Sequence, residues 1–225
     1  DYGFTNDQLI PSGMPRYDLV DTAAHPQKRI LLAPSWRKYL VSEQPGLKFE
    51  AKRTAFLESS FWKETKHLLE SSALFELLEK HGYVLDVKLH PIFSVYEDEF
   101  EALSNEYIRL VNSVKESDYA VFVTDYSSWV FDFVYLKRAI AYFLPDAVEF
   151  AAGLNGYHQL DLPLEDGFGP LCKTADELLS ELERILKQDG SPAPEYACKM
   201  DGFFLHYDNS QRDRLYEALM RPRKR

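Results

Sequence analysis

The fold class is decided by one stretch, Tyr119-Ala-Val-Phe-Val-Thr-Asp-Tyr-Ser-Ser128. Its first six residues, Tyr119–Thr124, form a continuous apolar run, which is typical of a strand buried on both faces of a parallel sheet. A polar turn follows and leads into a strongly apolar segment, so we predict a helix over Ser127–Leu136. A buried strand, a short polar turn and a helix in this order indicate a parallel α/β sheet.

Further strand and helix patterns alternate on both sides of this unit. Short apolar runs predict strands at Arg29–Ala33, Tyr83–Leu89, Tyr107–Val111 and Ala139–Leu144. Helical apolar spacing and capping residues predict helices over Thr54–His81, Phe93–Leu103, Ala175–Gln188 and Ser210–Leu219. This order predicts an α/β fold, a Rossmann-like parallel sheet with helices on both faces.

Helix ends and a long irregular stretch complete the pattern. Gly82 and Gly190 stand where C-terminal caps belong. Thr174–Glu177 (TADE) has the spacing of a capping box at the start of a helix. Several Gly and Pro residues make Pro145–Gly169 irregular.

Polar and ring side chains directly follow four of the predicted strands. The four strand exits are Pro34–Arg37, His90–Pro91, Asp125–Ser128 and Pro145–Asp146. Because ligands of parallel α/β sheets bind beyond the carboxyl ends of the strands, we expect these exits to share one edge. The convergence of four exits predicts a ligand site there more strongly than any single residue does.

The exit Asp125–Ser128 carries the clearest chemistry. Small hydroxyl residues at a helix start leave backbone N–H groups open, and with the positive end of the helix dipole they form an anion site. Ser127 and Ser128 therefore fit a phosphate group. The alternative is that Asp125 or Ser127 only caps the helix.

Two other exits supply a histidine and an arginine. His90 can serve as an acid, as a base or as a hydrogen-bond donor to a phosphate near neutral pH. Pro91 keeps the backbone of His90 extended. Arg37 is suited to bidentate contact with a phosphate. The alternatives are a hydrogen-bonded histidine without a ligand and a surface salt bridge.

Composition excludes several classes of protein. The chain has 225 residues, 45% of them hydrophobic, which is enough for the core of one α/β domain. Its formal net charge of -10 argues against a nucleic-acid-coating role. Two cysteines exclude a disulfide scaffold, and no apolar run reaches the roughly 18 residues of a transmembrane helix. Dinucleotide, Walker A and zinc-binding motifs are absent from the sequence, so we expect no protein-held metal.

The apolar strand and its exit also carry a family resemblance. Val123–Lys137 resembles the signature T-D-Y-S-S-x-x-F-D-F-x-x-L-x-K of the CDP-glycerol glycerophosphotransferase family, the teichoic-acid primases and polymerases of bacterial cell envelopes. Shorter matches keep the family's order: Gly13–Asp18 is similar to G-x-P-R-x-D, Leu32–Arg37 to Y-A-P-T-W-R, and Lys88–Pro91 to R-L-H-P, with Gly169-Pro170 and Asp208–Arg212 further along. The resemblance covers roughly Gly13–Leu215.

The resemblance implies one half of a GT-B architecture, in which two Rossmann-like domains enclose the site between them. This chain is similar only to the carboxyl-terminal, CDP-binding half, and the family's acceptor-side W-H-G-T-P-x-K segment does not occur in it. We therefore expect residues 1–28 to be a lead-in from a missing domain, residues 29–220 to bind the donor, and residues 221–225 to form a basic tail. Asn155 stands where the family often has arginine.

The resemblance also implies roles for individual residues. Ser127 and Ser128 would hold the donor pyrophosphate, and His90 would be the catalytic residue that stabilises charge on the leaving CMP. The further phosphate contacts would be Arg37 and Arg16, and the loop-orienting residues Asp125 and Asp132. No metal and no other cofactor is implied.

The resulting prediction is a transferase domain. Glycerol phosphate or a similar alditol phosphate would pass from a CDP-activated donor to a polymer or lipid-linked acceptor, which the missing amino-terminal domain would bind. We expect a cytoplasmic protein without a nucleic-acid partner, and peripheral contact with the inner face of the bacterial membrane stays open. Two alternatives remain: a UDP-sugar glycosyltransferase or 2-epimerase-like domain of the same fold, and a non-catalytic nucleotide-binding module.

Overall fold

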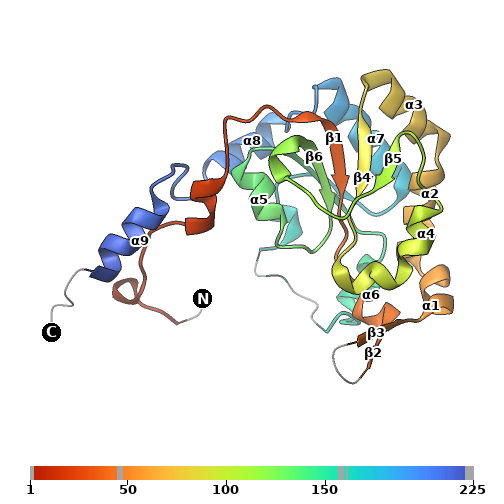
Figure 1. The fold of residues 1–225 in the computed structure, drawn as a ribbon, viewed down its shortest axis with the longest axis horizontal. Coiled ribbons are helices and arrows are strands. Elements are labelled where there is room, and N and C mark those ends of the chain that lie inside the picture. The colour runs from red at the N-terminus through yellow and green to blue at the C-terminus, as the bar shows by residue number, and fades with distance from the viewer. Residues whose placement is uncertain (1–2, 45–47, 157–159, 161, 221–225) are drawn as a thin grey trace.

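A six-stranded parallel sheet forms the centre of the molecule (Figure 1). The computed structural model describes residues 3–44, 48–156, 160 and 162–220. The spatial order of the sheet is β5-β4-β1-β6-β7-β8, and every neighbouring pair is parallel. The strands are β1 (Gln27–Leu32), β4 (Val84–Val87), β5 (Ile108–Leu110), β6 (Tyr119–Thr124), β7 (Ala139–Phe143) and β8 (Leu171–Cys172). The predicted parallel α/β sheet is confirmed.

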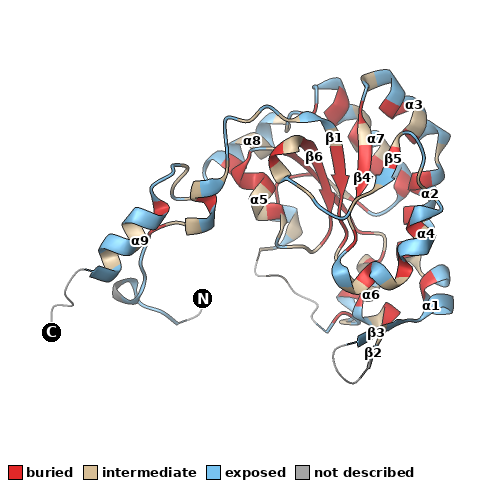
Figure 2. Ribbon diagram, viewed as in Figure 1, coloured by how far each residue is buried: buried red, intermediate tan, exposed pale blue. Residues whose placement is uncertain are grey.

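Helices cover both faces of the sheet, as predicted. The helices are α1 (Arg53–Glu58), α2 (Ser60–Glu70), α3 (Ser72–His81), α4 (Glu97–Glu101), α5 (Val130–Tyr135), α6 (Ala147–Ala151), α7 (Ala175–Lys187), α8 (Pro194–Asp201) and α9 (Gln211–Met220). Apolar side chains of α1 to α4 and α7 share one core with the sheet, and those of α5 and α8 share the core on the other face. Figure 2 shows the buried residues on the strands and on the inner sides of these helices. Within the described part of the chain, every helix is too short or too polar to span a bilayer.

The predicted helix Thr54–His81 is divided into three helices, so that expectation was wrong. Ser59 and Ser71 both have extended backbones, with ψ of 149° and 125°. The hydroxyl of Ser59 accepts a hydrogen bond from the N–H of Trp62 and begins a new helix. The apolar spacing continues across both breaks because all three helices pack on the same face of the sheet. Gly82 ends α3 with a φ of 70°, as predicted.

Other boundaries differ from the sequence pattern as well. Phe93–Leu103 was predicted as one helix, but a 3-10 turn over Pro91–Tyr96 precedes the short α4. An antiparallel hairpin, β2 (Val41–Gln44) with β3 (Lys48–Ala51), lies between β1 and α1 and was not predicted. The helices α6 and α8 and the two-residue strand β8 were not predicted either.

The start of helix α7 follows the capping pattern that its sequence predicts. The hydroxyl of Thr174 accepts a hydrogen bond from the N–H of Glu177, as the capping pattern predicts. The carboxylate of Glu177 reaches the N–H of Lys173 rather than that of Thr174. The first half of the capping box is therefore formed, and its return bond is displaced by one residue.

Both ends of the chain fold together into what we call the terminal lobe, residues 3–20 and 205–220. The carboxylate of Asp18 accepts hydrogen bonds from the N–H groups of Gln211 and Arg212, at the start of α9. The side-chain oxygen of Gln211 accepts one from the N–H of Met14. The ring of Tyr17 stacks on Tyr135 of α5 with centroids 4.1 Å apart, which joins the lobe to the sheet domain. The basic tail at residues 221–225 lies outside the described residues.

Candidate functional site

The carboxyl ends of the strands meet at one edge of the sheet, which we call the carboxyl rim. In Figure 1 the arrowheads point to the side where α6 and the β2–β3 hairpin lie. Because β4, β1, β6 and β7 are consecutive neighbours, the four predicted exits lie side by side. The chain proceeds from β1 through β4 to β5 and then returns to β6 on the other side of β1, so the strand order reverses between β1 and β6. Ligands of open α/β sheets bind at such a switch point.

A buried ion cluster joins three of these exits. Arg37 has no exposed surface, and its Nε and Nη2 donate to the two oxygens of Asp146 at 2.5 and 2.8 Å. Its Nη1 donates to Asp125 at 2.6 Å and to the carbonyl oxygen of Ser35 at 2.8 Å. Burial alone would lower the pKa of Arg37, but the two carboxylates outweigh burial and raise its pKa. We call these four residues the Arg37 clamp.

The clamp corrects the expectation for Arg37. Its residue type and position predicted a phosphate contact, with a surface salt bridge as the alternative. In the structure Arg37 is an interior residue, and each of its three guanidinium nitrogens already donates to the protein. Asp125 is equally engaged, because it also accepts hydrogen bonds from the N–H and the hydroxyl of Ser35. No surface of Arg37 is left for a ligand.

The turn after Asp125 presents two serines at the carboxyl rim. Ser127 is half-buried and Ser128 is exposed. The hydroxyl of Ser127 accepts a hydrogen bond from the N–H of Trp129 at 3.2 Å, which lies within the turn and does not cap α5. Helix α5 begins at Val130 rather than at Ser127, because residues 127–129 form a turn closed by the carbonyl of Ser127.

His90 is held in one tautomer at the exit of β4. Its Nδ1 accepts a hydrogen bond from the N–H of Ile92 at 3.2 Å, and therefore the neutral ring carries its proton on Nε2. Burial lowers the pKa of His90, and the positive charge of Lys88 lowers it further. The imidazole is thus a neutral hydrogen-bond donor at pH 7. The backbone at His90 is extended, with φ of −61° and ψ of 142°, as Pro91 predicts.

An open cavity of about 250 Å³ lies beside His90, between the ends of β4 and β5. Its polar lining comes from Lys88, His90, Ser94, Glu97 and Asn112. This volume is just below the range for small-molecule sites, roughly 300–1,000 Å³. On the β1 side, the centroid of the Trp36 ring lies 6.2 Å from that of His90, and Trp36 directly precedes Arg37 in the chain.

The remaining two predicted residues pair with each other. Arg16 donates to Asp132 of α5 at 2.5 Å and to the hydroxyl of Tyr17 at 3.1 Å. Burial raises the pKa of Asp132, although the nearby Arg16 opposes this. About half of the Arg16 side chain is exposed. Asp132 therefore contacts the terminal lobe, and the Asp125–Ser128 turn is oriented by Ser35 and Arg37.

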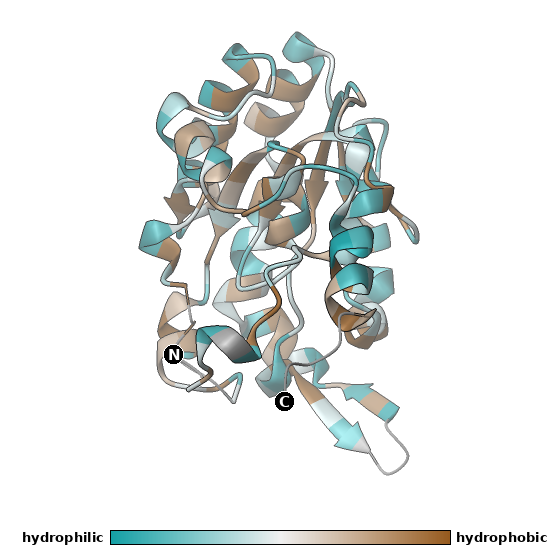
Figure 3. Cartoon of the chain, turned by 90° about the vertical axis from the view of Figure 1, so that its left-hand side faces the viewer, coloured by the Kyte–Doolittle hydropathy of each residue, from teal (hydrophilic) through white to brown (hydrophobic). Residues whose placement is uncertain are grey.

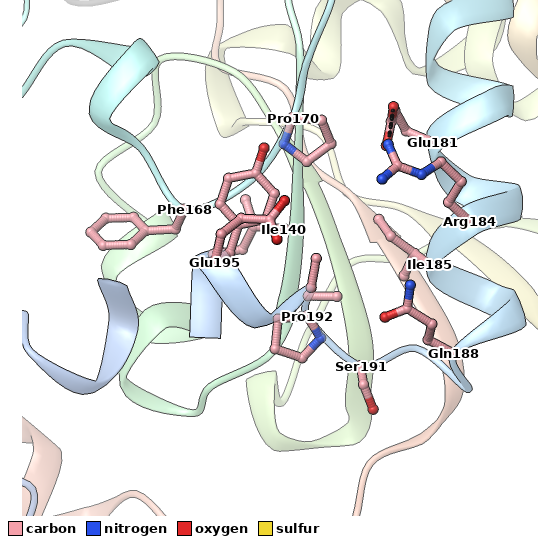
Figure 4. A pocket seen from close by; sticks show the side chains of 13 residues that line it. Ile140, Phe168, Pro170, Glu181, Arg184, Ile185, Gln188, Ser191, Pro192 and Glu195 are labelled. Carbon is pink, nitrogen blue, oxygen red and sulfur yellow. Dashed lines mark hydrogen bonds and ion pairs between the residues drawn. The ribbon is translucent and has the colours of Figure 1, made fainter. Parts of the chain in front are cut away.

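Another cavity, of about 340 Å³, lies at the amino ends of the strands and is lined in part by His25, Lys28 and Arg138. Figure 4 shows a cavity of about 40 Å³ between α7, α8 and the amino end of β7, lined by residues such as Ile140 and Ile185 and closed on one side by the Glu181–Arg184 ion pair. It has room for one or two waters and lies away from the carboxyl rim. Among the described residues, no group of three His, Cys, Asp or Glu side chains is placed to hold a metal ion.

Sequence reasoning did not assign a role to Asp146, Ser35 or Tyr39. Asp146 has no exposed surface and accepts a further hydrogen bond from the hydroxyl of Tyr39 at 2.9 Å. Asp146 did stand out as a strand exit, but β6 separates β7 from β1 in the sheet. Nothing in the local pattern indicates that Asp146 and Arg37 meet.

These features define a class of protein domain: a Rossmann-like α/β domain with a hydroxyl-bearing turn and a donor histidine at its topological switch point. The chain matches the family described as CDP-Glycerol:Poly(glycerophosphate) glycerophosphotransferase over residues 1–221. It belongs to this family, and the resemblance found in the sequence is confirmed.

Curated relatives in this family are much longer proteins. The chain is 24% identical to the minor teichoic acid biosynthesis protein GgaB of Bacillus subtilis (strain 168), covering 97% of the chain and 24% of that protein. It is 28% identical to the teichoic acid poly(glycerol phosphate) polymerase of the same strain, covering 82% of the chain and 24% of that protein. The chain therefore spans about a quarter of the length of these two relatives.

A solved structure shares the fold. The wall teichoic acid polymerase TagF superposes with a TM-score of 0.53 at 22% sequence identity, over 92% of this chain and 50% of the TagF chain. At this identity the likeness concerns the fold alone. The sheet order and the helical layers described above are consistent with it.

Proposed function

We propose that this chain is the donor-nucleotide-binding domain of a transferase of teichoic-acid-like cell envelope synthesis. The donor would be a CDP-activated alditol phosphate such as CDP-glycerol, and the acceptor a polymer or a lipid-linked chain. The observation that carries the proposal is the switch point itself: the exits of β4, β1 and β6 are neighbours there, the β6 exit presents Ser127 and Ser128, and the β4 exit presents an exposed His90 whose neutral ring donates from Nε2. Membership in the glycerophosphotransferase family supports this choice of donor.

The geometry supports a division of labour among these residues. The hydroxyls of Ser127 and Ser128, with the open backbone of their turn, would hold the diphosphate of the donor. The Nε2–H of His90 would donate to the same phosphates, and the cavity beside His90 would receive the nucleoside. An acceptor hydroxyl would attack the glycerol phosphate phosphorus in line, the bond from that phosphorus to the bridging oxygen would break, and CMP would leave. Positioning and charge stabilisation would provide most of the rate enhancement.

The acceptor is proposed to bind outside this chain, on a further domain of a longer polypeptide. The terminal lobe exposes large apolar side chains, among them Phe4, Leu9, Leu19, Leu205 and Leu219. Figure 3 looks onto this lobe from its outer side. Exposed apolar patches of this kind commonly mark contacts with another folded unit. The greater length of the curated relatives is consistent with such a unit.

The donor site is tested by calorimetric titration of this chain with CDP, UDP, CMP and CDP-glycerol. We expect CDP to bind more tightly than UDP, and the double variant Ser127→Ala/Ser128→Ala to weaken CDP binding by about 10- to 100-fold, since hydrogen bonds to charged groups are each worth about 1.5–3 kcal/mol. The matched control is Ser180→Ala/Ser191→Ala, which removes two hydroxyls far from the carboxyl rim and should leave CDP binding unchanged.

Two outcomes would count against this donor. Equal or tighter binding of UDP would favour the glycosyltransferase or epimerase-like alternative in the same fold. If a complete polypeptide also bound none of the four nucleotides, the chain would share only the fold of the family, and the proposed function would be wrong.

A separate expectation concerns transfer by the isolated chain. We expect residues 1–225 to bind the donor and to release CMP at a rate about 10³-fold or more below that of the complete polypeptide, because the acceptor hydroxyl is not held against the phosphorus. The measurement is CMP release from CDP-glycerol in the presence of a glycerol phosphate oligomer. Equal rates for the two proteins would place the acceptor site within this chain and contradict the need for a further domain.

A further inference from the structure

The Arg37 clamp lies directly behind the proposed phosphate turn. Asp125 belongs to the clamp and is separated from Ser127 by one residue, Tyr126. The guanidinium carbon of Arg37 lies 5.5 Å from the centroid of the Tyr126 ring. The same ring stacks on Phe150 of α6, with centroids 3.6 Å apart. The backbone that leads into the two serines is therefore fixed on two sides, by a carboxylate and by a stacked ring.

The hydrogen bonds of the clamp fit a group that positions a turn rather than a group that binds a ligand. Arg37 is fully buried between the rings of Phe61 and Tyr126, and its bonds run to three exits of the carboxyl rim. Two carboxylates, Asp125 and Asp146, face this one cation, so the cluster carries an excess negative charge that would repel a phosphate. A planar guanidinium can hold two carboxylates at once in a defined geometry, and an ammonium cannot reproduce that geometry.

We propose that Arg37 is a positioning residue, which holds the Asp125–Ser128 turn in the conformation that receives the donor phosphates without touching the donor. This inference rests on the proposed function, because the turn it positions is the proposed phosphate site. It replaces the direct phosphate contact that the sequence predicted for Arg37.

The chain contains a matched control for this clamp. Arg29 of β1 forms a second ion pair with a fully buried carboxylate, Asp86, and the hydroxyl of Tyr119 contacts the same pair. This pair lies within the sheet, in the first half of β1, and away from the carboxyl rim. Replacing Arg29 with lysine therefore disturbs a buried Arg–Asp pair without disturbing a strand exit.

The experiment compares Arg37→Lys with Arg29→Lys. The first measurement is amide hydrogen exchange of residues 125–129 in the protein without nucleotide, and the second is the affinity for CDP. We expect Arg37→Lys to speed exchange of this turn by about 10-fold and to weaken CDP binding by about 10-fold or more. Arg29→Lys should change neither, even if both variants lower the melting temperature equally. Because exchange is measured without ligand, a direct contact between Arg37 and the donor would not produce the first effect.

The possible results separate this inference from the proposed function. Weak CDP binding by Arg37→Lys with normal exchange of the turn would indicate a direct contact and overturn the positioning role. Faster exchange with unchanged CDP affinity would overturn it too, since the turn would then not matter for the donor. Failure of the unaltered protein to bind CDP, here and in the complete polypeptide, would instead reject the proposed function. If Arg37→Lys does not fold, Ser35→Ala removes only the hydroxyl that donates to Asp125, and the same two measurements apply with smaller changes in the same direction.

Discussion

Replacing His90 with alanine in the complete polypeptide is expected to lower the rate of transfer by about 10²- to 10³-fold. The N–H of Ile92 occupies Nδ1, so the neutral ring can offer only its Nε2–H to a donor phosphate. A hydrogen bond to the leaving phosphate strengthens as negative charge develops on it, and its loss therefore lowers kcat more than it raises KM. The measurement is the steady-state rate of CMP release at saturating CDP-glycerol.

The control for this variant is His67→Ala. His67 is an exposed residue of α2 whose Nε2 lies 3.8 Å from Asp176 of α7, and its loss should leave transfer unchanged. Because burial and Lys88 hold the pKa of His90 below its ordinary value, the ring stays neutral from pH 8 down to pH 7. Unchanged transfer by His90→Ala would show that the histidine has no part in the reaction.

The sequence predicted those elements whose pattern is purely local. Tyr119–Thr124 was predicted with its exact bounds because all six residues are buried and a polar turn follows at once. The helix α7 was predicted within one residue, since Thr174 and the glycine at position 190 mark its ends. In both places the local pattern is enough to identify the element from the sequence.

The elements that were missed depend on tertiary contacts. The two residues of β8 are a strand only because β7 pairs with them, and no pattern can be seen in two residues. The breaks at Ser59 and Ser71 are similar, since serine is compatible with a helix interior and only the packing of three helices on one face decides where each begins.

The location of the candidate site was predictable from the sequence, but the contacts between its residues were not. The exits of parallel strands must share one edge, so the position of Ser127, Ser128 and His90 followed from the order of the elements. The partners of Arg37 are 88 and 109 residues away along the chain. A fully buried arginine with two carboxylates looks the same in sequence as an exposed arginine that binds phosphate, and only the structure distinguishes the two.

Gly169→Ala is expected to lower the unfolding free energy by about 3 kcal/mol. A Cβ atom at this position would lie 2.0 Å from the carbonyl oxygen of Ile140 and 2.6 Å from its carbonyl carbon. Both atoms belong to the backbone of β7, which is bonded on its other side to β6, so they cannot yield as a flexible side chain would. The measurement is chemical denaturation of this chain, with the midpoint and slope compared with those of the unaltered protein.

The contrast with Gly202→Ala makes this expectation specific. Gly202 has a φ of −94°, and a Cβ atom there would lie 3.9 Å from its nearest neighbour, the carbonyl oxygen of Cys198. Alanine should therefore change the unfolding free energy by less than about 0.5 kcal/mol at that position. Similar stabilities of the two variants would mean that β8 does not pair with β7 as closely as described.

The residue after Gly169 makes the first bond between β7 and β8. The carbonyl of Pro170 accepts a hydrogen bond from the N–H of Tyr142, so a chain displaced at Gly169 also loses this bond. The glycine of this Gly-Pro pair is thus required by the close approach of two backbones, which accounts for its place in the family pattern without any contact to a ligand.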